Sequence, residues 1–133
     1  MLVIETLLRS LENLVKALFM SDPAVLKVTI IDTDGMELVS LAKTFYSGKK
    51  DALPPMINQM QKFFDQFLPF MKKHPNDQFI FSWYFNALIL FCAGSPFGSI
   101  ILYCEKGVNE GLVKKLLRNA IGNFQIVMGP VFQ

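Results

Sequence analysis

The chain has 133 residues, one domain's worth, and at that length roughly two thirds of the unfolded surface can be buried. Thirteen basic and eleven acidic residues leave a formal charge of +2. The sequence has no dense cluster of basic residues, so it does not predict a nucleic-acid-binding surface. The composition is 52% hydrophobic with thirteen Phe. This is rich for a soluble monomer and predicts apolar surface that another protein covers.

The cysteines and the N-terminal segment indicate the compartment. Cys92 and Cys104 lie in apolar segments typical of strands, which favours free buried thiols in a reducing compartment over a disulfide. The first helical segment is interrupted by charges from Glu5 to Lys16, so it does not resemble a secretory signal. We therefore expect a cytoplasmic protein.

The first half of the chain predicts a helix, a hairpin, a polar loop and a second helix. Apolar residues recur every three or four positions over 2–19, as on one helical face. The Asp34-Gly35 pair predicts a tight turn between two strands within 25–41, and 42–53 reads as a loop. Pro54-Pro55 opens the second helix, which Pro69 is expected to end or kink near residue 70.

The least polar run, QFIFSWYFNALILFCAG at 78–94, could be a membrane span, a buried helix or two strands. Its fifteen-residue apolar core is shorter than the roughly twenty residues that a span needs, so direct membrane insertion is not expected. Residues 79–85 are rich in Phe, Trp, Tyr and Ile, which favour strands. The run therefore predicts strands at 78–85 and 88–92, joined at Asn86-Ala87.

The last part of the chain predicts one more strand and a final helix. AGSPFG at 93–98 reads as a connection, SIILYCE at 99–105 as a fifth strand, and 109–124 shows helical periodicity. The order is helix, strand, strand, helix, strand, strand, strand, helix. We expect an α+β fold, with a five-stranded antiparallel sheet, two helices on one face and one on the other.

In that order of elements the chain resembles the roadblock/dynein-light-chain family of the longin-like superfold. The residues that carry the resemblance are VTIIDTDGMELVS, FIFSWYFNALILFCAG and GSIILYCEKGVNEGLVKKLL, and it covers about residues 2–124. Within the family, the chain resembles the MEK-partner subunit of the Ragulator scaffold, with prokaryotic roadblock proteins as the other possibility. The resemblance implies a non-catalytic module that docks a small Ras-like GTPase or a larger complex, with recruitment to membranes only through partners.

The resemblance also implies a dimer, in which the third strands of two copies pair and the middle helices pack side by side. An independent argument supports association, because one helix about 10 Å across cannot cover a five-stranded sheet some 20 Å wide. An unpaired apolar edge strand would also be prone to aggregation. We expect a homodimer, or a heterodimer with another roadblock chain, through the following residues: Met56, Met60, Phe63, Phe64, Phe67, Phe79, Phe81, Trp83 and Phe85.

Candidate catalytic and ligand-binding residues are few. His74 belongs to a turn sequence, and Asp32 and Asp34 precede a turn glycine and are too few for a calcium loop. Arg9 and Arg118 could act as a GTPase-activating arginine, but exposed helix positions explain both. We expect no cofactor, no metal and no enzyme activity. The alternative hypothesis is a small-ligand sensor resembling PAS or GAF domains, whose aromatic strands would line a cavity of more than about 300 Å³.

Overall fold

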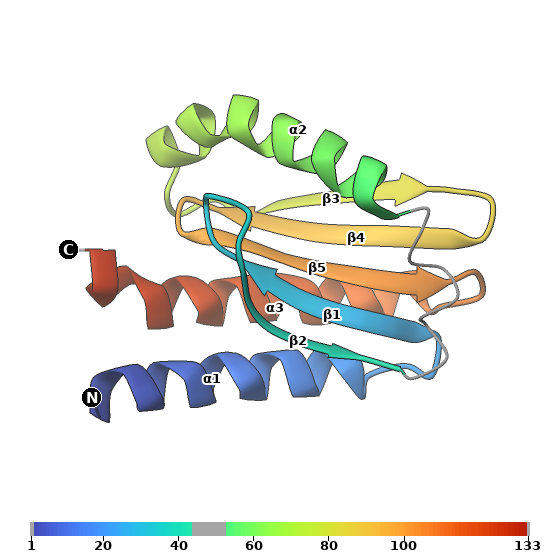
Figure 1. Cartoon of the computed structure of the whole chain (residues 1–133), viewed down its shortest axis with the longest axis horizontal. Coiled ribbons are helices and arrows are strands. Elements are labelled where there is room, and N and C mark those ends of the chain that lie inside the picture. Colours follow the sequence, from blue (N-terminus) through green and yellow to red (C-terminus); the bar gives the residue numbers. More distant parts are fainter. Residues whose placement is uncertain (1, 44–52, 133) are drawn as a thin grey trace.

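The computed structural model describes the backbone of residues 2–43 and 53–132, and the side chains of 4–43, 59–60 and 62–130. Its five strands form one antiparallel sheet in the order β2-β1-β5-β4-β3. Helices α1 and α3 lie side by side on one face, and α2 crosses the other face (Figure 1). The fold class expected from the sequence is therefore confirmed. The elements are α1 (Leu2–Phe19), β1 (Val25–Ile31), β2 (Glu37–Ala42), α2 (Leu53–Lys73), β3 (Phe79–Tyr84), β4 (Leu88–Ser95), β5 (Gly98–Glu105), α3 (Glu110–Met128) and a short 3-10 turn (Gly129–Phe132).

The larger core lies between the sheet and the pair α1 and α3. Each helix turns one apolar stripe to the strands, represented by Val15 of α1 and Leu117 of α3, both fully buried. The α3 helix begins at Asn109, whose side-chain oxygen accepts a hydrogen bond from the Leu112 amide at 3.1 Å. This cap satisfies a backbone donor that would otherwise be unpaired in the first turn.

The smaller core lies under α2, above β3 and β4. Met60, Phe64 and Met71 of the helix are buried against the sheet. Gly94 of β4 makes this close approach possible, because a Cβ there would lie 3.0 Å from both the Met71 sulfur and the Phe64 ring. The helix is therefore placed over the β3 side of the sheet.

On the same face, the sheet is polar where it continues toward β2. The Thr29 hydroxyl donates to Glu37 Oε1 at 2.9 Å, and Lys27 Nζ lies 3.5 Å from that oxygen and 5.6 Å from the Tyr103 ring centre. Burial alone would raise the pKa of the Glu37 carboxyl, but these neighbours outweigh it and the pKa is lowered. A charged network thus occupies part of the face that the sequence analysis expected to need apolar cover.

Two expected boundaries are wrong. The α2 helix continues through Pro69 to Lys73, because the proline removes one backbone hydrogen bond while Met71 beyond it is anchored in the core. The expected connection at 93–98 is largely strand. Residues 93–95 extend β4, Ser95 pairs with Gly98, and only Pro96 and Phe97 form the turn. Gly98 has φ +146°, which favours glycine at this position.

Candidate interaction surface at the β3 edge

The backbone of β3 presents hydrogen-bonding groups to the outside of the sheet. Only β4 pairs with it among the described strands. The Phe85 amide donates to the Leu88 carbonyl at 2.8 Å, so odd-numbered residues of β3 direct their backbone groups toward β4. The N–H and C=O groups of Ile80, Ser82 and Tyr84 therefore point away from the sheet, where another strand could pair with them.

Aromatic rings from α2 and β3 form a continuous cluster beside this edge. Phe63 of α2 is central, with its ring 4.8 Å from that of Phe81 and 5.9 Å from that of Trp83 in edge-to-face contacts, and 5.7 Å from Phe67 in a stacked contact. Phe67 in turn contacts Phe79 at 5.2 Å. Such pairs stabilise the helix on the strand beyond the area that they bury. We call the rings of Phe63, Phe67, Phe70, Phe79, Phe81 and Trp83 the edge aromatic cluster.

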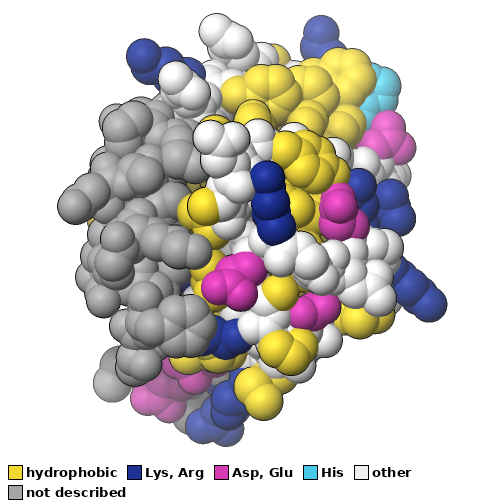
Figure 2. All heavy atoms as spheres, turned by 90° about the vertical axis from the view of Figure 1, so that its right-hand side faces the viewer, with side chains coloured by type: hydrophobic (Ala, Val, Ile, Leu, Met, Phe, Trp, Pro, Cys, Tyr) yellow, Lys and Arg dark blue, Asp and Glu magenta, His cyan; other side chains and the backbone are white. Residues whose placement is uncertain are grey.

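The members of the predicted interface differ in how far they reach the surface. Phe63 keeps 36% of its surface exposed, whereas Met60 and Phe64 are buried beneath α2 and could shape an interface only from below. Phe67, Phe79, Phe81, Trp83 and Phe85 are half-buried, and the side chain of Met56 lies outside the described residues. Hydrophobic side chains gather at the top of the molecule, over α2 (Figure 2).

The other face of β3 is joined to α3 by polar contacts. The Tyr84 hydroxyl donates to Glu110 Oε1 at 2.6 Å, and this bond, followed by partial burial and the carboxylate charge, raises the pKa of the tyrosine. Gln78 Nε2 donates to the Arg118 carbonyl at 3.1 Å. In the turn before β3, the Pro75 carbonyl accepts from Gln125 at 3.2 Å. The edge strand is thus fixed by rings on one side and hydrogen bonds on the other.

Two residues of this surface are absent from the predicted interface. Phe70 is 47% exposed and its ring lies 5.6 Å from that of Phe79, and Tyr84 is 60% exposed at the end of β3. The expected helix reaches about residue 70, and its spacing allows Phe70 on the same face as Phe63 and Phe67, but the predicted interface residues on this helix stop at Phe67. Nothing in the sequence pairs Tyr84 with Glu110.

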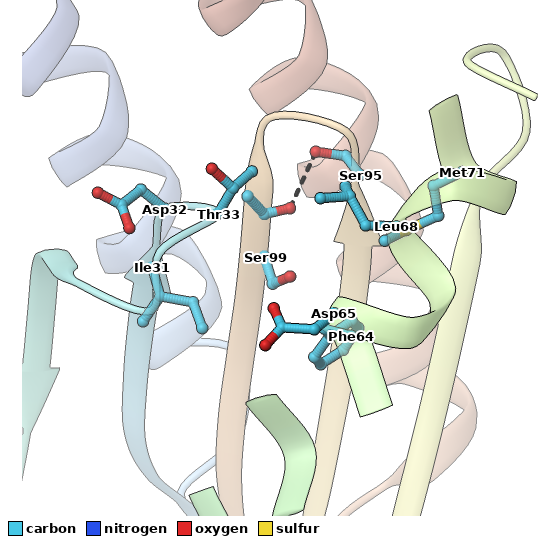
Figure 3. Close-up of a pocket in the computed structure, with 10 residues that line it drawn as sticks. Ile31, Asp32, Thr33, Phe64, Asp65, Leu68, Met71, Ser95 and Ser99 are labelled. Carbon is cyan, nitrogen blue, oxygen red and sulfur yellow. Dashed lines mark hydrogen bonds between the residues drawn. The ribbon is translucent and has the colours of Figure 1, made fainter. Parts of the chain in front are cut away.

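A small pocket lies on the α2 face, between the β1–β2 turn, α2 and the β4–β5 hairpin (Figure 3). Asp32, Asp65 and Ser99 border it, while Phe64 and Met71 form its apolar wall. Its volume is about 20 Å³, which is room for about one water molecule. This pocket cannot hold an organic ligand of the kind that a PAS-like or GAF-like sensor binds.

The remaining candidate residues have local structural roles. Asp32 Oδ1 accepts from the amides of Asp34 and Met36, both at 2.9 Å, as in an aspartate-stabilised turn. His74 is exposed after α2, with Nδ1 3.5 Å from an Asp77 carboxylate oxygen. Arg9 and Arg118 are exposed.

Within the described residues, no three His, Cys, Asp or Glu side chains group as metal ligands. Cys92 and Cys104 are free and buried, as expected. No helix in the described part of the chain has the length and apolar character to cross a membrane.

Solved structures of other proteins share the fold of this chain. MglC from Myxococcus xanthus is 13% identical, with a TM-score of 0.68 over 88% of this chain and 98% of its own. Myxococcus xanthus MglB is 10% identical, with a TM-score of 0.69 over 92% and 90% of the two chains. A Roadblock/LC7 domain from Streptomyces avermitilis is 8% identical, with a TM-score of 0.60 over 88% and 96%. The chain has the roadblock fold.

Sequence comparison alone does not reach this result, since no family model and no curated protein matches the chain. The roadblock fold expected from the order of the elements is confirmed by structure, and it spans nearly the whole length of these neighbours. In the roadblock fold of this chain, β3 is an edge strand and α2 lies beside it.

Proposed function

We propose that the chain is a non-catalytic scaffold that dimerises through β3 and α2 and docks a small Ras-like GTPase or a larger signalling or trafficking complex. The observation that carries the proposal is the β3 edge, where outward backbone groups lie beside the partly exposed edge aromatic cluster. Exposed aromatic surface of this kind is typical of protein interfaces. The GTPase and the cytoplasmic location are what the roadblock resemblance implies.

The geometry predicts a specific pairing between two copies. A two-fold axis at Ser82, the middle of the strand, pairs Ser82 with the partner's Ser82 and Ile80 with the partner's Tyr84, so that all outward groups are used. Phe81 then lies beside the partner's Trp83 on the α2 face. The two α2 helices meet over the junction, near Phe63. A heterodimer would use the same edge with another roadblock chain.

Dimerisation is tested with Ser82→Pro, and Ser82→Ala is the matched control. Proline removes the outward N–H at a position where edge strands tolerate it, whereas alanine keeps the N–H. In the symmetric dimer two hydrogen bonds are lost and two carbonyls are left unpaired, at a cost of about 3 kcal/mol. Light scattering and sedimentation should therefore show a dimer for the wild type and Ser82→Ala, and a dissociation constant raised about a hundredfold for Ser82→Pro. A monomeric wild type would refute the homodimer.

Docking of a GTPase is tested separately with the purified protein. We expect one of the Ras-like GTPases of the source organism to bind, with an affinity that differs between its GDP and GTP-analogue forms. Calorimetry or surface plasmon resonance measures this. If none binds in either nucleotide state while the dimer forms normally, the GTPase proposal is wrong and only the scaffold remains.

A further inference from the structure

The opposite edge of the sheet, β2, presents a second row of outward backbone groups. Only β1 pairs with it among the described strands. The Lys43 amide donates to the Leu26 carbonyl at 2.9 Å, and the register continues through the pairs Val28–Leu41 and Ile30–Val39. The odd-numbered residues therefore direct their backbone groups toward β1. The N–H and C=O groups of Ser40 and Ala42 point outward, and the regular alternation ends at a bulge at Leu38.

A groove runs along this edge between β2 and α1. It is lined by Glu12, Asn13 and Lys16 of the helix and by residues 39–41 of the strand, and its volume is about 260 Å³. Leu41 is 38% exposed. The groove thus combines apolar strand residues with a charged helical border, next to backbone groups that can form a ladder.

The charges on α1 show which partner this edge fits. Glu5, Arg9, Glu12 and Lys16 are all exposed, and their spacing of four, three and four residues places them on one stripe of the helix. The groove places the middle of β2 beside residues 12–16 of α1. In an antiparallel pair of α1 helices centred there, between Glu12 and Lys16, Glu12 faces the partner's Lys16.

We propose that the β2 edge and the α1 stripe bind a second copy of this chain by two-fold antiparallel pairing. A two-fold axis between two β2 edges makes both the two β2 strands and the two α1 helices antiparallel. The strand pairing and the helix pairing therefore require the same orientation of the second copy. With the axis at Ser40, Val39 lies beside the partner's Leu41. This contact uses the edge opposite to β3, so both contacts can form at once and dimers join into larger even-numbered assemblies.

The backbone part of the proposal is tested with Ser40→Pro against Ser40→Ala. Sedimentation and light scattering are measured over a wide range of protein concentration. The wild type and Ser40→Ala should exceed the dimer mass as concentration rises, whereas Ser40→Pro should associate at this edge at least tenfold more weakly. A wild-type mass that never exceeds the dimer, or a Ser40→Pro protein that assembles like Ser40→Ala, overturns the proposal. If the wild-type mass never exceeds the dimer, the β2 edge would be a candidate site for a different protein and not for a second copy of this chain.

The charge part is tested with two double variants that leave the buried face of α1 unchanged. Arg9→Glu with Lys16→Glu makes the stripe acidic, and Glu5→Lys with Glu12→Lys makes it basic. Each should associate at least tenfold more weakly alone, and an equimolar mixture should restore assembly, which loss of helix stability could not produce. No restoration on mixing, with helicity unchanged by circular dichroism, contradicts the α1 contact.

The two edges are distinguished by combining the variants. If only the β2 proposal fails, Ser40→Pro changes nothing and Ser82→Pro weakens the dimer about a hundredfold. If only the β3 proposal fails, Ser82→Pro changes nothing and Ser40→Pro weakens the remaining association at least tenfold.

Discussion

Replacing Phe63 with alanine should weaken dimerisation, because Phe63 contacts Phe81 and Trp83, the two residues beside the expected two-fold axis at Ser82. Its exposed fraction is 36% of a side chain that can bury about 200 Å², so about 70 Å² per copy is open to a partner. At about 25 cal/mol per Å², that area contributes about 1.8 kcal/mol per copy and about 3.5 kcal/mol to the symmetric dimer. The dissociation constant should rise by two to three orders of magnitude.

The assay is sedimentation equilibrium of Phe63→Ala, with Ile126→Ala as the control. Ile126 is 73% exposed on α3 and lies outside the edge aromatic cluster, so its loss should leave the dissociation constant unchanged. Phe63→Ala also loses the ring contact with Phe81, and thermal unfolding by circular dichroism measures that separate cost to the fold. A folded Phe63→Ala protein that dimerises as tightly as the wild type would refute the reasoning.

Three further predictions concern the fold. Gly94→Ala would place a methyl group 3.0 Å from the Met71 sulfur. The free energy of unfolding, measured by denaturant titration, should therefore fall by about 1–3 kcal/mol. An unchanged free energy of unfolding would contradict the position of α2 on β4. Backbone N–H groups of Ala24 and Asn109 lower the pKa of Asp22 in the folded protein below 3.8. The ionised carboxylate of Asp22 therefore stabilises the fold fully above the pKa of the unfolded state. This stabilisation is lost as the pH falls through the lower pKa of the folded state. Below about pH 5, the melting temperature of Asp22→Asn should therefore fall less steeply with pH than that of the wild type. Equal slopes for the two proteins would contradict this. Burial raises the pKa of Cys104 to about 12, so its thiol should react with Ellman's reagent only after unfolding, and prompt reaction of the folded protein would be the contrary result.

Much of the fold could be predicted because local signals agree with it. Helical spacing identified α1 and α3, Asp34-Gly35 identified the first hairpin, and Asn86-Ala87 separated β3 from β4. The errors arose where tertiary packing prevails over local preference. Pro69 is a helix breaker by sequence, yet the buried Met71 holds the next turn against the sheet.

The candidate surface was predicted in part, since the pattern of apolar residues shows which rings share a face but not how deep each one lies. Met60 and Phe63 are three residues apart on the same side of α2, and the structure buries the first and exposes the second. The ion pair between Lys27 and Glu37 on the α2 face of the sheet also could not be predicted from local sequence. Their partnership follows from pairing across the β1–β2 hairpin.

The hydrogen bonds that fix β3 to α3 have a consequence for the kinetics of assembly. Tyr84, Gln78 and the turn at Pro75 are each tied to α3 within the single chain. A strand already held in its extended form loses little conformational freedom when a partner pairs with it. Association at this edge should then proceed at the rate of an ordinary encounter between folded proteins, about 10⁵–10⁷ M⁻¹s⁻¹, with no slow ordering step before it.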